Sequence, residues 1–131
     1  EGASKMIEYV VNGAESTEDA RQIIRTISDS SLIKTAMFGR DPNWGRIIAA
    51  AGRAGVDFDP DKIDLYVGTG DGMKLLENGQ PLRVNLMDLK KMMRSTELRI
   101  IIDLHQGEAT SKGWGCDLSY EYIRINAEYT T

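Results

Sequence analysis

Imidazole and thiol groups often act as bases, nucleophiles or metal ligands, and each occurs once in this sequence, as His105 and Cys116. A zinc or transition-metal site needs several such ligands at characteristic spacings, and no second His or Cys accompanies either residue. The favoured interpretation is structural for both. His105 is then a polar loop residue, with a catalytic or metal-binding role as the alternative, and Cys116 is a small apolar side chain at the start of a strand.

A glycine-rich stretch at residues 68–72 (GTGDG) follows an apolar run and has the composition of a phosphate-binding loop. Such a loop holds phosphate only when a helix begins directly after it, because the helix N-terminus supplies free N–H groups. Residues 73–79 (MKLLENG) instead predict a hairpin arm that ends in an Asn-Gly turn. The carboxylate of Asp71 would also repel a phosphate, so nucleotide binding is disfavoured.

The stretch DPNWGR, at residues 41–46, combines helix-starting residues with a large aromatic side chain. Asp41 or Asn43 can cap the helix that follows, and Trp44 would anchor this helix by burying its ring. This structural role is sufficient to explain the stretch. Direct contact between Arg46 and a ligand is the functional alternative.

Composition limits the classes of function. With 16 basic and 20 acidic residues the net charge is −4, so the composition lacks the excess of positive charge that favours nucleic-acid binding. No apolar run approaches the roughly 18 residues of a membrane span, so no membrane partner is expected. The single cysteine cannot form an internal disulfide and fits the reducing cytoplasm. The chain starts at Glu1 rather than Met, which indicates a processed product or a piece of something larger.

Hydrophobic periodicity predicts the elements that must position these residues. In the first half we expect a strand at residues 5–11, a helix from Ser16 or Thr17 to about Ser28, a strand at 32–38 and a helix at 44–53. The first helix has one apolar face, formed by Ala20, Ile23, Ile24 and Ile27. Gly45 and Gly52 would let another element approach the second helix closely.

The second half predicts a strand at residues 63–67, a hairpin around Asn78-Gly79, a helix at 86–93 and a central strand at the very apolar 98–104. On this second-half helix, Lys90, Lys91 and Arg94 are expected to face solvent. Residues 105–115 predict a polar, glycine-containing loop. A last strand, 116–129, changes its apolar parity near Tyr122, which predicts a bulge or a change of buried face.

This order of strands and helices predicts a single α+β domain over residues 1–131, in which helices pack on a mixed β-sheet. A chain of 131 residues is long enough for one such hydrophobic core and too short for two of stable size. No internal repeat or low-complexity segment divides the chain.

Several motifs occur together and in order: EGASK at residues 1–5, LIKTAMFG at 32–39, DPNWGR at 41–46, WGCDLSY at 114–120 and INAEYTT at 125–131. With these motifs the chain closely resembles the glutamate N-acetyltransferase/ornithine acetyltransferase family of arginine biosynthesis. The resemblance covers essentially the whole sequence and corresponds to the C-terminal part of that family's β chain. It implies a domain of an N-terminal-nucleophile-type acetyltransferase.

The resemblance implies a specific reaction. In the family a precursor cuts itself autocatalytically into α and β chains, and the threonine that the cut exposes takes acetyl from N-acetylornithine and gives it to glutamate. The products are ornithine and N-acetylglutamate. Because the amine of an N-terminal threonine can activate its own hydroxyl, an acetyl-threonine intermediate is implied. Neither a metal nor an organic cofactor is implied.

The resemblance also implies what this chain lacks and which partners it meets. The threonine nucleophile and the oxyanion hole lie outside residues 1–131, so no catalytic residue is assigned here and the chain alone is expected to be inactive. The expected partners are the α chain and the remaining β-chain segment of the same precursor, in an α2β2 heterotetramer. The expected ligands are the amino-acid substrates N-acetylornithine and glutamate.

Substrate-binding residues carry over at three positions of the matching motifs, namely Glu1, Asn126 and Thr131. The Glu1 carboxylate can accept hydrogen bonds from an ammonium group or steady the amine of the nucleophile. Asn126 offers a donor and an acceptor, and the Thr131 hydroxyl can donate to a substrate carboxylate. We therefore expect the two ends of the chain to meet, with the final strand carrying Asn126 into a shared cleft.

Two other classes of function remain as alternatives. One is a non-catalytic amino-acid-binding regulatory α+β module. The other is a related N-terminal-nucleophile amidohydrolase or aminopeptidase, which would pass the acyl group to water. Acetyl transfer to glutamate, measured against release of free acetate, separates this second alternative from an acetyltransferase.

Overall fold

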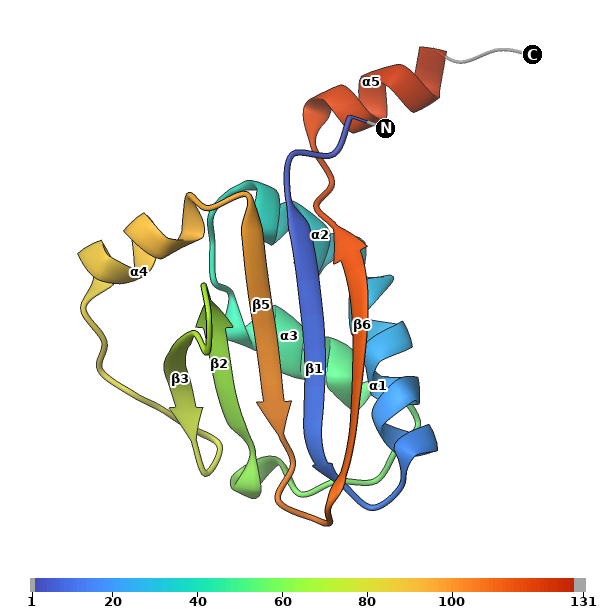
Figure 1. Cartoon of the computed structure of the whole chain (residues 1–131), viewed down its shortest axis with the longest axis vertical. Helices are drawn as coiled ribbons and strands as arrows, with labels where there is room; N and C mark the ends of the chain where they lie inside the picture. Colours follow the sequence, from blue (N-terminus) through green and yellow to red (C-terminus); the bar gives the residue numbers. More distant parts are fainter. Residues whose placement is uncertain (1, 129–131) are drawn as a thin grey trace.

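Six strands form one mixed sheet in the computed structural model, which describes residues 2–128 (Figure 1). The strands are β1 (Met6–Ala14), β2 (Asp64–Gly68), β3 (Met73–Glu77), β4 (Gln80–Pro81), β5 (Glu97–Asp103) and β6 (Ala109–Cys116). Their order across the sheet is β4-β3-β2-β5-β1-β6. β1 and β5 pair parallel, and the other neighbours pair antiparallel. The arrangement confirms the predicted α+β class and the interior position of the apolar strand β5.

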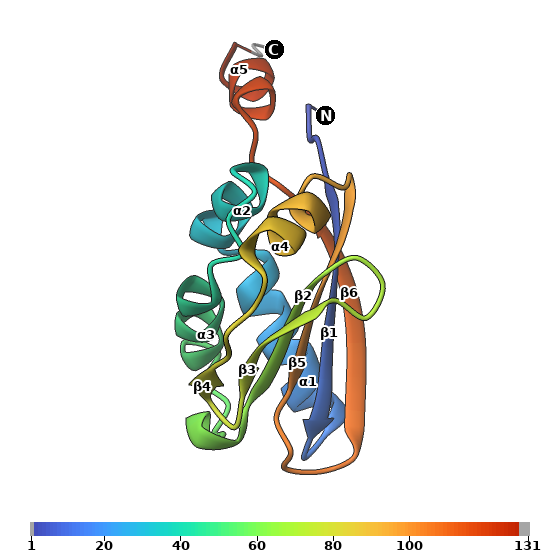
Figure 2. The same ribbon diagram turned by 90° about the vertical axis from the view of Figure 1, so that its left-hand side faces the viewer.

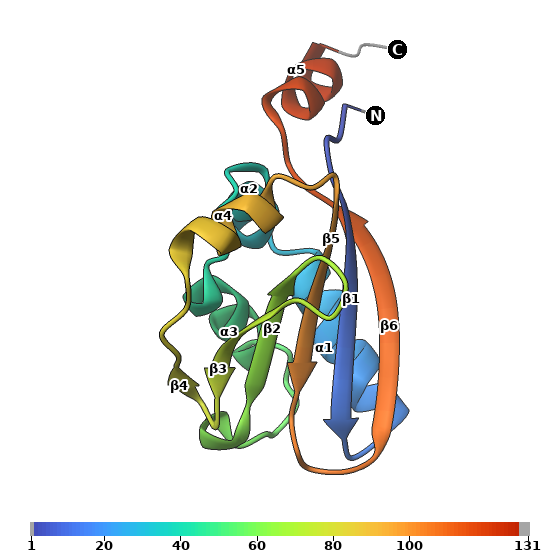
Figure 3. The same ribbon diagram turned by 60° about the vertical axis from the view of Figure 1, so that its left-hand side comes forward.

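Five α-helices accompany this sheet within residues 2–128. They are α1 (Thr17–Ser28), α2 (Ser31–Phe38), α3 (Trp44–Gly52), α4 (Leu86–Met93) and α5 (Tyr120–Glu128), with a short 3-10 turn at Pro60–Lys62. In Figure 2, α1, α2 and α3 lie on the same side of the strands. Figure 3 shows α5 projecting beyond the end of the sheet, on the side where the N-terminal segment enters β1.

Side chains of neighbouring strands meet in register beneath the helices. The parallel register aligns three buried pairs: Ile7 with Leu98, Tyr9 with Ile100, and Val11 with Ile102. The adjacent strand β2 contributes the buried Leu65 and Val67. Alternate residues point to the opposite face of the sheet, where Glu8 and Arg99 form an ion pair at 3.1 Å. The period of two along each strand therefore decides which face becomes the core.

The predicted first helix is confirmed as α1. The Ser16 side chain caps it by accepting the Asp19 N–H at 3.0 Å. The acidic residues of the first turn suit the positive end of the helix dipole. The predicted apolar face is buried at all four positions: Ala20, Ile23, Ile24 and Ile27.

Residues 105–115, predicted as a loop, instead contain most of strand β6. Glycine and polar residues obscure this strand in the sequence because it is an edge strand whose outward side chains, such as Lys112 and Trp114, are exposed. Its inward positions are small because α1 lies close. A Cβ at Gly113 would stand 2.7 Å from Ile24 Cγ2. The strand thus pairs with β1 through its backbone and leaves room for the helix.

Residues 32–38, predicted as a strand, form most of helix α2. The Ser30 side chain caps this helix by accepting the Ile33 N–H at 3.3 Å. The buried residues Ile33, Ala36 and Met37 follow the helical spacing of three and four. An apolar run of this length fits either a strand or a buried helix, and the cap is the signal that decides between them.

The predicted helix after DPN is confirmed as α3. Of the two predicted caps, Asn43 is the one that forms, since its Oδ1 accepts the Arg46 N–H at 3.1 Å. Two other details of the prediction are wrong. Trp44 does not anchor the helix by burial, because it stands on the first turn beside an open hollow and remains 43% exposed. No atom lies within 4 Å of a Cβ built at Gly52, so this glycine does not mark a close approach.

The predicted hairpin and the second-half helix are confirmed. β3 and β4 flank Asn78 and Gly79, which adopt φ values of 49° and 74°. A Cβ at Gly79 would lie 2.3 Å from the Pro60 carbonyl oxygen, so the turn requires glycine. Residues 68–72 connect β2 to β3 without a helix. In α4 and its cap the predicted solvent-facing residues are exposed: Lys90, Lys91 and Arg94.

The predicted strand at residues 116–129 is wrong for residues 117–128. Only Cys116 is a strand residue, because β6 ends there and helix α5 follows. Ser119 starts this helix, because its Oγ accepts the Tyr122 N–H at 2.9 Å. A hydroxyl that satisfies a free N–H three residues later is a helix cap, and a strand offers no such contact.

Charge pairs one turn apart also favour the helical form of α5. Arg124 forms ion pairs with Glu121 and, at 3.1 Å, with Glu128. Spacings of three and four residues bring side chains together on a helix and not on a strand. Tyr122 and Ile125, three residues apart, are the half-buried side chains of α5. The change of apolar parity near Tyr122, predicted as a bulge or a change of buried face in a strand, therefore reflects the spacing of half-buried side chains on a helix.

Candidate functional site

The segment before β1 runs beside the segment that joins β6 to α5 (Figure 1). The carboxylate of Asp117 connects the two segments. It accepts the backbone N–H of Ser4 at 2.8 Å, that of Lys5 at 3.0 Å, and the Ser4 hydroxyl. Asp117 is 0% exposed. Hydrogen bonds to an ionised carboxylate are stronger than neutral ones, so Asp117 holds the N-terminal segment in place.

Lys5 extends this connection to helix α4. Its side chain is buried, and its ammonium group donates to the carbonyl oxygens of Met93 and Ser95, both at 2.8 Å. These carbonyls lie at the C-terminal end of α4, where the helix dipole favours a cation. Burial and the charge of Arg40 lower the pKa of Lys5, while the Asp117 carboxylate acts in the opposite direction.

Ser119 joins the N-terminal segment to α5. Its hydroxyl donates to the Gly2 carbonyl oxygen and accepts the Tyr122 N–H. Gly2 has a φ of 84°, and a Cβ there would lie 2.8 Å from Tyr122 Cα. The position therefore requires glycine on both conformational and steric grounds. The described ends of the chain are in contact at the first turn of α5.

Asn126 lies one helical turn beyond Tyr122, on the exposed surface of α5. Its Nδ2 donates to the Tyr122 carbonyl oxygen at 2.8 Å, which orients the amide. Within residues 2–128 no donor reaches its Oδ1, so this atom can accept a hydrogen bond from a ligand. Asn126 is exposed on the helix that the N-terminal segment touches.

Glu1 and Thr131, the other two predicted substrate-binding residues, lie outside the described residues. The structure therefore places Asn126 alone of the three, on a helix instead of the predicted strand. Their joint grip on a substrate stays a prediction. The meeting of Glu1 with Asn126 and Thr131 also stays a prediction; what the structure shows is Gly2 beside Tyr122 and hydrogen-bonded to Ser119.

Sequence reasoning missed the two residues that build this junction, Asp117 and Ser119. Both stand inside the WGCDLSY motif. The local signal for a helix start is a Ser that can cap, here Ser119, followed by an acidic and a basic residue three positions apart, here Glu121 and Arg124. Nothing local marks Asp117, because its three donors lie 112 and 113 positions away.

His105 lies apart from this junction, just beyond the end of β5, with a φ of 53°. Its Nε2 lies 2.8 Å from Oδ2 of the buried Asp64, which also accepts the Asn78 N–H at 3.0 Å and has Lys74 Nζ at 3.5 Å. Burial acts to raise the pKa of Asp64, but the hydrogen bonds from Asn78 and His105 and the Lys74 charge lower it overall. His105 thus has a structural partner.

The remaining candidate residues also have structural surroundings. Arg46 donates through Nη1 to the Leu32 carbonyl oxygen at 3.0 Å, which ties α3 to α2. Cys116 is half-buried at the end of β6. Within residues 2–128 no three His, Cys, Asp or Glu residues are grouped so that they could hold a metal ion. In the same range no helix combines the length and apolarity needed to cross a membrane.

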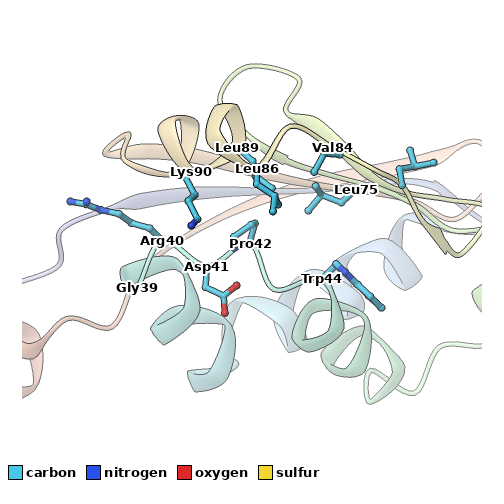
Figure 4. Close-up of a pocket in the computed structure, with 11 residues that line it drawn as sticks. Gly39, Arg40, Asp41, Pro42, Trp44, Leu75, Val84, Leu86, Leu89 and Lys90 are labelled. Atoms are coloured by element: carbon cyan, nitrogen blue, oxygen red, sulfur yellow. The ribbon is translucent and has the colours of Figure 1, made fainter.

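An open hollow of about 520 Å³ lies between residues 39–44 and helix α4 (Figure 4). Its walls are largely apolar: Pro42, Trp44, Leu75, Leu82, Val84, Leu86 and Leu89. In Figure 4 the Arg40 side chain points away from these residues. The hollow is thus distinct in character from the polar junction of the chain ends.

Fold and junction together define an α+β protein with helices on a mixed sheet, whose N-terminal segment is hydrogen-bonded to the start of its last helix. The comparisons with known proteins agree with this class and assign the chain to one family within it. The ArgJ family model matches residues 1–131. The chain belongs to the ArgJ family.

Curated relatives match along the whole chain. It is 47% identical over 131 residues to the arginine biosynthesis bifunctional protein ArgJ of Staphylococcus epidermidis and 50% identical to that of Dehalococcoides mccartyi. It is 48% identical over 136 aligned residues to the glutamate N-acetyltransferase of Methanocaldococcus jannaschii. These alignments cover 100% of this chain but 32%, 32% and 34% of the relatives. The chain therefore spans about a third of their length.

A solved structure shares the fold. The crystal structure of the arginine biosynthesis bifunctional protein argJ from Bacillus halodurans superposes with a TM-score of 0.92 at 38% identity. The match covers 98% of this chain and 60% of that chain. A likeness this extensive means that the two chains share the fold.

Proposed function

We propose that this chain is the substrate-binding part of an ornithine/glutamate acetyltransferase of arginine biosynthesis. The complete enzyme moves acetyl from N-acetylornithine to glutamate. The observation that carries the proposal is the junction of the chain ends, where Asp117 and Ser119 hold residues 2–5 against the start of α5. The printed names of the relatives, ArgJ and glutamate N-acetyltransferase, support the reaction class.

In this proposal the reaction has two halves. A threonine hydroxyl, supplied by a segment outside residues 1–131, attacks the acetyl carbonyl of N-acetylornithine, and the amide bond breaks to release ornithine. The amine of glutamate then attacks the acetyl-threonine ester, which restores the hydroxyl and yields N-acetylglutamate. The threonine's own amine acts as the base in such systems. Residues of this chain bind the substrate and make no covalent bond.

Each binding residue has a role that its chemistry fits. Glu1 would accept hydrogen bonds from a substrate ammonium group or from the nucleophile's amine. Asn126 would use its Oδ1, which no donor within residues 2–128 reaches, while one N–H of its Nδ2 is engaged by the Tyr122 carbonyl. Thr131 would donate to a substrate carboxylate. The hydrogen bond within α5 preorganises Asn126, which lowers the entropy lost on binding.

The proposal includes the surroundings of this chain. It pairs the chain with the α chain and the rest of the β chain, formed by autocatalytic cleavage, in an α2β2 assembly in the cytoplasm. The exposed apolar side chains of α5, Tyr120 at 81% and Ile123 at 49%, support contact with another segment. Residues 1–131 would then act as one domain of the larger enzyme.

The test is steady-state kinetics of the complete enzyme with Asn126→Ala. Removal of one ligand hydrogen bond, at about 1 kcal/mol, should lower kcat/KM for both amino-acid substrates roughly fivefold or more. Arg124→Ala is the control on the same helix, because it removes both ion pairs of α5 but no proposed ligand contact. Unchanged constants in Asn126→Ala, or equal losses in both variants, would contradict the assigned role.

The two alternatives give different results in the same assay. A related amidohydrolase would release free acetate from N-acetylornithine without needing glutamate. A non-catalytic module would bind amino acids and release neither acetate nor N-acetylglutamate. Removal of Thr130 and Thr131 adds a second test, since it should weaken substrate use far more than it lowers the free energy of unfolding.

A further inference from the structure

A second hollow, also of about 520 Å³, opens beside the N-terminal segment. Three basic side chains line it, and each comes from a different part of the chain. Lys5 precedes β1, Arg40 follows α2, and Arg94 caps α4. The other side chains at this hollow are Ser4, Phe38 and Thr96, and no described acidic residue lines it.

The fold holds these three cations together. Lys5 is fixed by its two hydrogen bonds to the end of α4 and by Asp117 at its backbone N–H. Arg40 has a φ of 58° at the turn that ends helix α2, where its N–H donates to the Met37 carbonyl oxygen at 3.2 Å and fixes its backbone. Its side chain points away from the apolar hollow of Figure 4.

Within residues 2–128 no carboxylate neutralises the positive charges of Arg40 and Arg94. The arginines of this range that form ion pairs are Arg25, Arg99 and Arg124, whereas neither Arg40 nor Arg94 has a described carboxylate within 4.0 Å. The buried carboxylate of Asp117 does not line the hollow and already accepts three hydrogen bonds from the N-terminal segment. The charge of Arg40 reaches Lys5, whose pKa it helps to lower. An anion in the hollow would relieve this repulsion.

We propose that the hollow formed by Lys5, Arg40 and Arg94 is a binding site for a small oxyanion that carries at least two negative charges, such as a dicarboxylate or a phosphate group. The two guanidinium groups supply forked N–H donors that match carboxylate and phosphate oxygens. The hydroxyls of Ser4 and Thr96 add polar lining. The site does not rest on the acetyltransferase proposal, since its residues differ from Glu1, Asn126 and Thr131.

Anion titration of the complete protein tests the site. Inorganic phosphate and glutarate are titrated by calorimetry at low ionic strength, and the two probes distinguish a phosphate from a dicarboxylate ligand. The wild type should bind at least one of them saturably, and higher salt should weaken that binding. Arg40→Asn, chosen because Asn tolerates a positive φ, and Arg94→Gln should each weaken it at least tenfold.

Two matched variants make the result specific. Arg21→Gln removes an exposed arginine of α1 and should leave the affinity unchanged. Asn126→Ala should also leave it unchanged, which separates this site from the proposed substrate site. Absence of saturable binding in the wild type, or an equal loss in Arg21→Gln, would overturn the proposal. Thermal unfolding of each variant establishes that affinity was compared between folded proteins.

Discussion

The buried carboxylate of Asp117 accepts the backbone N–H of Lys5 at 3.0 Å, although the two residues are 112 positions apart in the sequence. This hydrogen bond, together with two from Ser4, fastens the segment before β1 to the connection between β6 and α5. The first and last described parts of the chain therefore behave as one structural unit. The proposed positioning of substrate-binding residues depends on this unit.

Asp117→Asn should loosen the N-terminal segment. The substitution removes a charge that accepts three hydrogen bonds and turns an N–H group toward donors, so a buried donor loses its partner. We expect a loss of about 2–3 kcal/mol in the free energy of unfolding. Urea denaturation measures the loss, and hydrogen exchange of residues 4 and 5 shows where it arises.

Asp57→Asn is the control for this change, because Asp57 is an exposed aspartate. It should change the free energy of unfolding by less than about 0.5 kcal/mol. If both variants lose the same stability, or if the exchange of residues 4 and 5 does not accelerate in Asp117→Asn, the carboxylate does not fasten the segment.

Gly2→Ala should separate the N-terminal segment from α5. An added Cβ would meet Tyr122 Cα at 2.8 Å and would also occupy a left-handed conformation, with φ at 84°. In the complete enzyme we expect kcat/KM to fall more than tenfold, because the change displaces the N-terminal segment relative to α5, which carries the proposed binding residue Asn126. Kinetics with both substrates and thermal unfolding provide the two readouts.

Gly55→Ala is a matched control for backbone strain. Gly55 has a φ of 77°, close to that of Gly2, but no atom lies within 4 Å of a Cβ built there. It carries the conformational cost of about 1 kcal/mol without the clash. Comparable kinetic losses in the two variants would show that strain alone, and not contact with α5, explains the effect.

The Asp64–His105 contact predicts a pH dependence of stability. The folded protein lowers the pKa of Asp64 below its ordinary value of about 3.9, so the ionised carboxylate is stabilised by folding. This contribution is present above the ordinary pKa and is lost as the pH falls through the lower, folded value. Unfolding by urea, measured between pH 7 and the acid limit of folding, should show the loss below about pH 4.

His105→Asn tests the source of that dependence. Asn tolerates the φ of 53° at this position but removes the ring that contacts Asp64 at 2.8 Å. We expect a loss of about 1 kcal/mol at pH 7 and a smaller difference from the wild type at acid pH. If the free energies of unfolding of the variant and the wild type differ by the same amount at every pH, the lowered pKa of Asp64 is due to Asn78 and Lys74 instead.

Local patterns decided the elements whose signals lie within one or two turns of chain. The Ser16 cap and the apolar spacing of α1 predicted that helix with its buried face. The Asn78-Gly79 turn predicted a hairpin, and the apolar run at residues 98–104 predicted a strand inside the sheet. In each case the pattern of side chains matches the period of the element that buries them.

Patterns failed where burial is set by a distant element. The inward-facing residues of β6 are small because α1 packs closely against them, as at Gly113 beside Ile24. The sequence of β6 therefore lacks the alternation of apolar and polar residues that predicts a strand. The apolar run at residues 32–38 has the length of a strand but packs as helix α2. The last segment forms α5 through Ser119 and the charge pairs of Arg124.

Residue types and short spacings were enough to predict the α+β class, the family resemblance and the candidate residue Asn126. The position of Asn126 on a helix, and the joining of the chain ends by Asp117 and Ser119, became known from the folded chain. Only the fold brought Lys5, Arg40 and Arg94 around one hollow. Contacts between residues more than 80 positions apart follow from how strands and helices pack, and no local pattern encodes them.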